Sequence, residues 1–242
     1  MQPLTLIPVH GIPEIRPDDR LARLIADAAA AQDTPLLDGD CLVVTQKIVS
    51  KAEGRLVPVD PDDRAARRAL VESESVRVLR RRGDLVISET AHGFVCANAG
   101  IDLSNVDEGW AALLPVDSDR SARRIRDALR ATRGVEVAVV VSDTFGRPWR
   151  NGLVNVAIGC AGFPALVDLR GQTDHHGRTL EMTVVALADE VAAASGLVMG
   201  KSSRVPVALV RGVDVASSAP GRAADLVRAP DEDLFREGTI EP

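Results

Sequence analysis

The segment VEVAVVVSD, residues 135–143, gives the strongest structural signal in the chain, because valine stands at five of its nine positions. A short run this rich in β-branched residues favours a strand that is buried on both faces. Amphipathic stretches predict helices over 18–31, 62–81 and 119–131, and a stretch that is apolar on nearly all sides predicts a buried helix over 179–195. Other short apolar runs predict strands over 41–45, 84–88, 94–98, 165–169 and 205–210. This alternation predicts the fold class α/β (α+β), with helices packed on mixed sheets.

The composition limits the kinds of partner that the chain can bind. With 242 residues, of which 45% are hydrophobic, the chain is long enough for one large domain or two small ones. A net charge of −6 and an aromatic content of 2% argue against nucleic-acid binding. No apolar run approaches the roughly 20 residues of a membrane span, and the amino-terminal sequence has no signal-peptide pattern. We therefore expect a cytoplasmic protein with neither nucleic acid nor membrane as a partner.

The stretch GLVMGKSS, residues 196–203, looks similar to a phosphate-binding P-loop. The P-loop pattern has four residues between its glycines, whereas three separate Gly196 from Gly200. A P-loop also follows a strand and precedes a helix, whereas we expect this stretch to follow a helix capped at Gly196 and to precede a strand. We therefore reject P-loop chemistry here. The glycines, lysine and serines still favour an anion-binding loop, with a plain helix-to-strand connection as the alternative.

The stretch VVTQKIVSKAEGRLV, residues 43–57, places polar side chains just beyond a predicted buried strand. Gln46, Lys47 and Lys51 follow the strand over 41–45, and strand ends of this kind often face a ligand crevice in α/β folds. The two lysines suit phosphate groups. The alternative is the start of a solvated basic helix.

Two further stretches carry carboxylates with neighbouring oxygen or amide groups. In NAGIDLSNV, residues 98–106, Asp102 and Asn105 are either ligand-binding or ordinary turn residues. In VVVSDTFGRPWRNG, residues 139–152, we expect the strand to end near Asp143 and Thr144 and a loop stiffened by Pro148 to follow. Carboxylate and hydroxyl oxygens suit Mg²⁺, which keeps waters and takes substrate phosphates as partners. A plain strand cap is the alternative.

Two remaining stretches are predicted to have no catalytic role. Asp174-His175-His176 reads as a loop rather than a metal site, because adjacent histidines rarely converge on one ion. From Ser217 onward the sequence predicts irregular structure with one short helix near 221–228. Together, the two carboxylates, the lysines and the Gly-Lys-Ser loop indicate phosphoryl transfer from a nucleotide, with the acceptor left open.

At these stretches the chain resembles the coenzyme F420-0:L-glutamate ligase family, most closely the ligase half of its actinobacterial fusion members. The resemblance covers almost the full chain and is specific, because many ordered blocks share it. They include LIPVHGIPEIRPDD, GDCLVVTQKIVSKAEGRLVPV, AGIDLSNV, LLPVDSDRSARRIR, VVVSDTFGRPWRNGLVNVAIGCAG, LRGQTDHHGRTLEMTVVALADEVAAASGLVMGK and PVALVRG. One position departs from many relatives, which have glutamine where Lys201 stands here, and a cation cannot ligate a metal.

The resemblance implies a GTP-dependent ligase that adds L-glutamate to coenzyme F420-0 through an acyl phosphate, and then a γ-linked glutamate. It implies two divalent ions, Mg²⁺ or Mn²⁺, with K⁺ as a further candidate. It also implies a two-part fold that forms an intertwined homodimer. We expect residues 1–242 to form one ligase unit, with subdomains at about 1–82 plus 197–242 and at about 83–196. The alternatives from other classes are a catalytically degenerate GTP-binding module of the same fold and an unrelated phosphotransferase.

The resemblance also assigns roles residue by residue. Asp102 and Asp143 match metal carboxylates with a catalytic role, Thr144 matches a neighbouring metal contact, and Lys51 is a further catalytic candidate. The positions that match nucleotide contacts are Ile12, Pro13, Glu14, Ile15, Gln46, Lys47, Lys51, Asn105, Met199, Gly200, Lys201, Ser202, Ser203, Arg204, Val205 and Pro206.

Overall fold

The computed structural model describes residues 3–214 and 221–233 and has a five-stranded sheet at its centre. The strand order is β1-β12-β2-β8-β9, and among these neighbours only β2 and β8 run parallel. Its strands are β1 (Thr5–Pro8), β2 (Cys41–Thr45), β8 (Ala138–Arg147), β9 (Arg150–Ala161) and β12 (Val207–Arg211). The mixed α/β (α+β) class is therefore confirmed.

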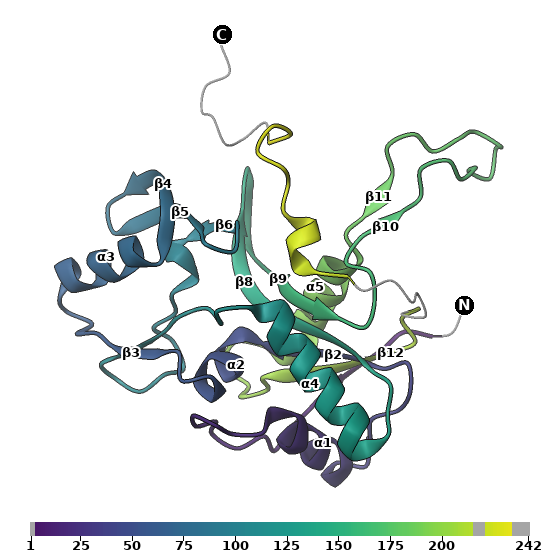
Figure 1. Cartoon of the computed structure of the whole chain (residues 1–242), viewed down its shortest axis with the longest axis horizontal. Helices are drawn as coiled ribbons and strands as arrows, with labels where there is room; N and C mark the ends of the chain where they lie inside the picture. The colour runs from purple at the N-terminus through teal and green to yellow at the C-terminus, as the bar shows by residue number, and fades with distance from the viewer. Residues whose placement is uncertain (1–2, 215–220, 234–242) are drawn as a thin grey trace.

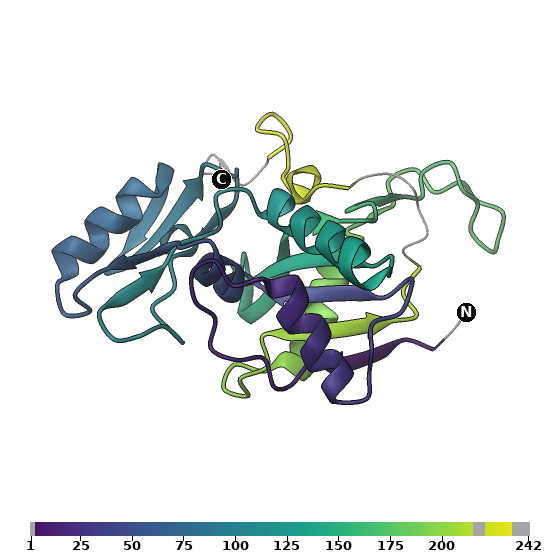
Figure 2. The same ribbon diagram turned by 60° about the horizontal axis from the view of Figure 1, so that its bottom comes forward.

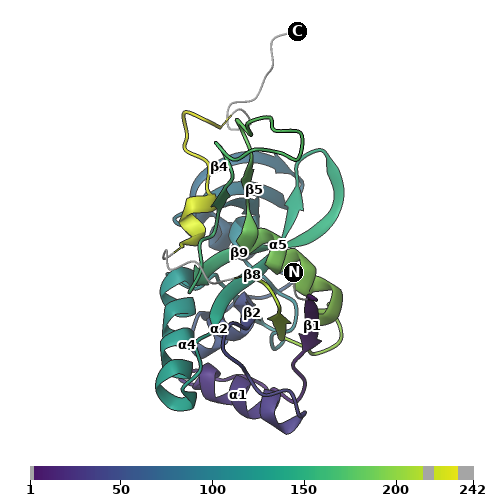
Figure 3. The ribbon, with the colours of Figure 1, turned by 90° about the vertical axis from the view of Figure 1, so that its right-hand side faces the viewer.

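Helices cover both faces of this sheet, as Figure 3 shows. On one face, α1 (Leu21–Ala31) and α4 (Ser118–Arg133) lie side by side (Figure 2) and pack into the larger apolar core. On the other face, α5 (Leu187–Met199) packs into a second core. β2 is buried along nearly its whole length because both of its faces are covered.

A smaller lobe packs beside the sheet and appears on the left in Figure 1. It joins a helix to a three-stranded antiparallel sheet and to a two-stranded ladder. Its elements are α3 (Arg64–Ser73), β4 (Ser75–Arg82), β5 (Leu85–Thr90), β6 (Val95–Ala97), η1 (Asn98–Gly100), β3 (Leu56–Pro58) and β7 (Trp110–Ala112). α2 (Gln46–Ala52) connects β2 to this lobe. β10 (Val167–Asp168) and β11 (Val184–Val185) form the base of an arm that projects from the body (Figure 1).

Two predicted helices have the wrong extent. The helix over 62–81 ends at Ser73, and residues 75–82 form β4, because a turn at Gly83 lets them pair with β5. The helix over 179–195 lies instead at 187–199, since residues 183–185 pair with 167–169 on the opposite side of the arm. Gly196 is consequently inside α5 and is not its cap; the helix ends at Met199 and is capped by Gly200.

The strand over 135–143 begins at Ala138 and does not end at Asp143. It continues to Arg147 and turns into β9, because β8 and β9 satisfy each other's backbone groups in a long hairpin. The loop predicted up to residue 152 is therefore wrong for the start of β9, and the rest of that strand was not predicted. β1 was also missed. The strand over 165–169 is confined to 167–168, whereas those over 41–45, 84–88, 94–98 and 205–210 and the helices over 18–31 and 119–131 are confirmed within a few residues.

The carboxyl-terminal residues are described only in part. The short helix near 221–228 is confirmed as η2 (Ala223–Leu226), while Ser217 lies outside the described residues. The central sheet draws strands from both of the predicted subdomains, and that division stays a prediction. No helix among the described residues is long and apolar enough to cross a membrane.

Candidate active site at the ends of two parallel strands

Three chain segments meet at one edge of the central sheet. β2 and β8 are parallel, with Thr45 opposite Ser142, so the segments that follow these residues leave from the same edge. α2 begins directly after Thr45, and Asp143 follows Ser142. β12 runs antiparallel to β2, with Val207 opposite Val44, so the loop over 200–206 arrives at this edge too. The topology therefore brings together the lysines of α2, the carboxylate of β8 and the Gly-Lys-Ser loop.

Lys47 joins α2 to the turn that carries Asp102. Its Nζ lies 2.8 Å from Asp102 Oδ2 and donates to Ser104 Oγ at 2.7 Å. The backbone N–H of Ser104 donates to Asp102 Oδ1 at 2.7 Å. Burial acts to raise the pKa of Asp102, but the hydrogen bonds from Lys47 and Ser104 outweigh it and hold that pKa below its ordinary value. Asp102 is therefore a carboxylate that stays ionised at neutral pH.

The pKa of Asp143 is shifted in the opposite direction to that of Asp102. Burial raises its pKa to about 6, and the negative charge of Asp102 adds to the rise. The N–H of Thr144 and the ammonium groups of Lys201 and Lys47 act in the other direction and offset this only in part. A carboxylate in this condition is stabilised by any further cation that arrives, because the cation favours its charged form.

Lys201 reaches the same place from the loop after α5. Its ammonium donates a hydrogen bond to Thr144 Oγ1, next to Asp143 in the chain. The pKa of Lys201 lies below its ordinary value, because burial and the charge of Lys47 lower it by more than Asp143 and Asp102 raise it. Two carboxylates and two ammonium groups thus interact within one cluster, the central cluster, formed by Asp102, Asp143, Lys47 and Lys201.

The other predicted residues of α2 lie on its buried side. Gln46 is 1% exposed, and its Oε1 accepts from Ser50 Oγ at 2.9 Å, while its Nε2 has no hydrogen-bond partner among the described residues. A buried donor left without an acceptor costs about 1–3 kcal/mol, so a ligand oxygen or a water would stabilise it. Lys51 forms an ion pair with Glu14, which ties α2 to the predicted nucleotide segment over 12–15. This α2 is a short helix, but it is not the solvated basic helix considered as an alternative, since Lys51 is buried.

Some predicted nucleotide positions have side chains that point away from any ligand. Ile15, Met199 and Val205 are 5%, 2% and 5% exposed and belong to the apolar cores, so only their backbones are available. Asn105 is exposed at a left-handed φ of 56°, and none of the hydrogen bonds found among the described residues joins its side chain to the central cluster. Ser203 Oγ donates back to the carbonyl of Met199, which holds the loop in a turn.

The donor set fits a divalent cation that brings its own further ligands. Within the part of the chain that the structure describes, no group of three or more histidine, cysteine, aspartate or glutamate side chains converges on one point. Asp102 and Asp143 do interact, and Thr144 adds a hydroxyl oxygen. Two carboxylates with substrate phosphates and waters are a common Mg²⁺ environment. In the structure, the ammonium of Lys47 pairs with Asp102 Oδ2 and that of Lys201 donates to Thr144 Oγ1. An incoming metal ion would replace the ammonium groups at these two oxygens.

Two polar residues of this site escaped the sequence analysis. Ser104 bonds both Lys47 and Asp102, and its place in the Asp-Leu-Ser turn is the only signal that could have revealed it. Asn155 accepts from Thr144 Oγ1 at 2.9 Å. It interrupts the otherwise apolar run LVNVAIG, residues 153–159, but only the pairing of β9 with β8 shows what it contacts.

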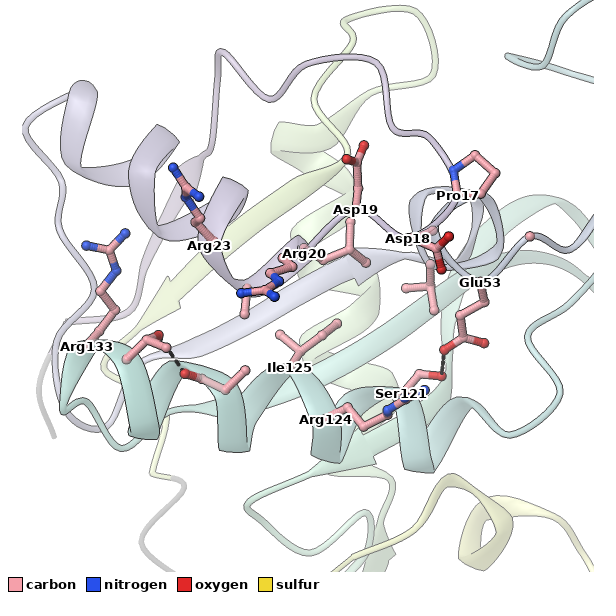
Figure 4. Close-up of a pocket in the computed structure, with 17 residues that line it drawn as sticks. Pro17, Asp18, Asp19, Arg20, Arg23, Glu53, Ser121, Arg124, Ile125 and Arg133 are labelled. Atoms are coloured by element: carbon pink, nitrogen blue, oxygen red, sulfur yellow. Dashed lines mark hydrogen bonds between the residues drawn. The ribbon is translucent and has the colours of Figure 1, made fainter.

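A pocket of about 1010 Å³ lies apart from the central cluster, between α1, the end of α2 and α4 (Figure 4). Ile125 is part of its apolar lining, and Ser121 Oγ donates to Glu53 Oε1 at 2.5 Å beside it. None of the residues predicted to bind metal or nucleotide lines this pocket. We therefore place the chemistry at the central cluster, where the charged groups converge, and assign no substrate to the pocket.

Comparison with known proteins agrees with a site of this kind. The chain matches the family described as F420-0:Gamma-glutamyl ligase over residues 11–212. A relative from Methanothermobacter thermautotrophicus, named Coenzyme F420:L-glutamate ligase, is 44% identical over 96% of this chain and 99% of its own length. Relatives with the same name from Methanopyrus kandleri and Archaeoglobus fulgidus are 40% and 38% identical, each over 96% of this chain. They are covered over 98% and 96% of their own lengths.

Proposed function

Because the chain belongs to the F420-0:gamma-glutamyl ligase family, we propose that it is a GTP-dependent ligase that joins L-glutamate to coenzyme F420-0 in coenzyme F420 biosynthesis. A second, γ-linked glutamate follows the first. The names of the relatives supply L-glutamate and coenzyme F420. For this chain, the observation that carries the proposal is the central cluster at the ends of β2 and β8, where carboxylates and lysines meet.

The proposed reaction has two steps. A carboxylate oxygen of coenzyme F420-0 attacks the γ-phosphorus of GTP, the bond from that phosphorus to the β,γ-bridging oxygen breaks, and GDP leaves. The product is an acyl phosphate. The amine of L-glutamate then attacks the acyl carbon, inorganic phosphate departs with the electrons of the broken C–O bond, and the amine loses a proton as the amide forms.

The first step brings an anionic carboxylate against an anionic phosphate chain, so the site has to neutralise negative charge. Lys47 and Lys201 supply two ammonium groups at these strand ends, and Lys51 supplies a third further along α2. Lys47 and Lys51 are held by their acidic partners before any ligand arrives. Charge-assisted hydrogen bonds from ammonium groups to phosphate oxygens are the contacts that these side chains are suited to make. We assign Lys51 to the reacting phosphates and Lys201 to the phosphates held by its loop.

The divalent ions complete this neutralisation. When bound, one or two Mg²⁺ or Mn²⁺ ions supply positive charge at the transferring phosphoryl group. Asp102, Asp143 and Thr144 are the residues that would hold them, with K⁺ as a further candidate ion at the nucleotide. The chain's own part is to keep Asp102 ionised through Lys47 and Ser104 and to present Asp143 in a buried setting that favours cation binding.

The test is to incubate the protein with GTP, Mn²⁺, L-glutamate and coenzyme F420-0 and to count the added glutamyl units by mass spectrometry. We expect products carrying one and then two glutamates, together with GDP and phosphate. The matched control is Asp143→Asn, which keeps the size of the side chain and removes the anionic ligand. Turnover with ATP in place of GTP, or wild-type turnover by the control, would overturn the proposal.

A second measurement needs no coenzyme. GTP together with Mn²⁺ is expected to raise the melting temperature of the protein, because a ligand that binds only the folded state stabilises it. ATP is expected to raise it far less. Stabilisation by ATP alone would count against the ligase.

A further inference from the structure

The hydroxyl of Thr144 makes two hydrogen bonds in the central site, and its neighbours determine their direction. The ammonium of Lys201 can only donate, so Thr144 Oγ1 must accept from it. The single hydroxyl proton is then left for the other partner, Asn155 Oδ1, at 2.9 Å. The oxygen lone pairs of Thr144 consequently face the cation, and its proton faces away.

The strand pairing places Asn155 for this contact. Thr144 and Asn155 are directly opposite each other in the β8–β9 hairpin. The register shifts by one residue between the pairs Val141–Gly159 and Ser142–Ala157. Without that shift, Thr144 would lie opposite Val156, which has no side-chain acceptor. A bulge that changes which side chain meets a site residue is a recurrent device next to active sites.

Gly196 leaves room for the amide of Asn155 on its other side. A Cβ atom at Gly196 would lie 3.1 Å from Asn155 Nδ2, closer than ordinary van der Waals contact. α5 therefore has a glycine in its interior where alanine would be a better helix former. The glycine allows Asn155 to keep its Oδ1 against Thr144.

We propose that Asn155 is a positioning residue that turns the Thr144 hydroxyl so that its lone pairs face the cation beside Asp143. In the structure this cation is the ammonium of Lys201; in the ligase reaction it is a divalent ion, so this inference rests on the proposed function. Without the acceptor at 155, the hydroxyl proton is free to turn toward the cation and weaken its binding. Groups that orient a metal ligand commonly change metal affinity by one to two orders of magnitude.

The test is Mn²⁺ binding, followed by electron paramagnetic resonance in the presence of a non-hydrolysable GTP analogue. Asn155→Leu is expected to weaken Mn²⁺ binding roughly tenfold. The same substitution in a Thr144→Val background is expected to have no further effect, because the hydroxyl through which Asn155 acts is then absent. An equal loss in both backgrounds, or no loss in either, would overturn the positioning role.

Two further variants separate positioning from general damage to the fold. Asn155→Asp keeps an acceptor oxygen and should bind Mn²⁺ more tightly than Asn155→Leu does. Gly196→Ala should fold well, because alanine favours the helix, yet weaken Mn²⁺ binding by displacing the Asn155 amide. If Asn155→Leu fails to fold, the decision passes to Gly196→Ala with and without Thr144→Val. If the effect of Asn155→Leu on Mn²⁺ binding does not depend on the Thr144 hydroxyl, this inference alone is refuted. If that dependence is found but the protein has no ligase turnover, the proposed function alone is refuted.

Discussion

At the level of single residues, Asp143 carries a conflict between stability and ligand binding. Its pKa rises from 3.8 to about 6 on folding because it is buried near Asp102. A raised carboxyl pKa means that the folded state binds the proton more tightly than the unfolded state. The contribution of this group to stability is therefore fully present below about pH 4 and is lost as the pH rises through about 6.

Asp143→Asn should accordingly stabilise the metal-free protein at pH 7 while it abolishes metal-dependent turnover. A shift of about two pKa units, which already includes the favourable charges of Lys201 and Lys47, corresponds to about 2–3 kcal/mol in the free energy of unfolding. Denaturant titrations of both proteins at pH 7 and at pH 4, with chelator present, measure the difference. The gain should be largest at pH 7 and vanish at pH 4. A variant that is less stable than wild type at pH 7 would contradict the burial argument.

Lys201 should affect GTP more than it affects the fold. Its side chain lies on an exposed loop, so Lys201→Ala removes little packing. The loss of an ammonium–phosphate contact is expected to raise the KM for GTP about tenfold, while the melting temperature changes by less than about 2 °C. Steady-state kinetics and thermal melting report the two quantities. Arg178→Ala, an exposed cation on the projecting arm, is the matched control, and an unchanged KM for GTP would make the 200–206 loop purely structural.

At the level of elements, the contact of α4 with β9 is tight enough to require glycine. A Cβ atom at Gly159 would lie 2.4 Å from the backbone C and O atoms of Ser118, the first residue of α4. Asp119 also holds β9 by accepting from the N–H of Cys160 at 2.8 Å. The first turn of α4 therefore packs directly against the backbone of β9. Moving the two elements apart would break the hydrogen bond between Asp119 and Cys160.

Gly159→Ala should destabilise the protein by about 2–3 kcal/mol, because the added methyl group meets backbone rather than a movable side chain. Gly146→Ala, in the same hairpin, is the matched control, since a Cβ atom there would have Leu153 Cδ2 4.0 Å away. Urea unfolding of both variants compares the two sites. Similar stability changes at both positions would show that the contact of α4 with β9 is looser than the structure indicates.

The elements that the sequence predicts well are those whose signal is local. β2 is buried along almost all of its length, so an apolar run alone reveals it. In α1, Leu21 and Ile25 repeat with the helical period and face the core. β4 and β9 are different, because their strand state depends on partners. The arginine-rich sequence of β4 predicts a helix, and only its pairing with β5 makes it a strand. β9 is a strand because the chain reverses after β8 and pairs with it.

The site follows the same rule. Residue type made Asp102, Asp143 and Lys47 candidates but left an ordinary structural role open for each, and the family resemblance assigned their roles. The ion pair between Lys47 and Asp102 spans 55 positions of sequence and needs the fold to be seen. The contact of Asn155 with Thr144 depends on a one-residue shift of register, which no pattern in the sequence encodes.

For the whole molecule, the exposed apolar side chains bear on the predicted homodimer. Leu153 is 67% exposed and Trp149 is 78% exposed at the outer end of the β8–β9 hairpin. Met182, on the projecting arm seen in Figure 1, is 90% exposed. Two large apolar side chains exposed close together in the hairpin, Trp149 and Leu153, suit a surface that a partner covers. Because the hairpin also carries Asp143 and Thr144, a partner that covers its outer end would hold the site-bearing strand in place.

We therefore expect the protein to be a homodimer through the β8–β9 hairpin, and Leu153→Asp to shift it to a monomer. A charge in the apolar centre of an interface would be buried without a partner, which costs several kcal/mol per copy. Size-exclusion chromatography with light scattering measures the mass of each protein. Val76→Asp is the matched control, because Val76 is 69% exposed on β4 in the smaller lobe. A monomeric wild type would refute the dimer, and dissociation caused by Val76→Asp alone would move the interface to the smaller lobe. If the hairpin is the interface, monomeric Leu153→Asp should also bind Mn²⁺ less tightly than wild type, because the strand that carries Thr144 loses its support.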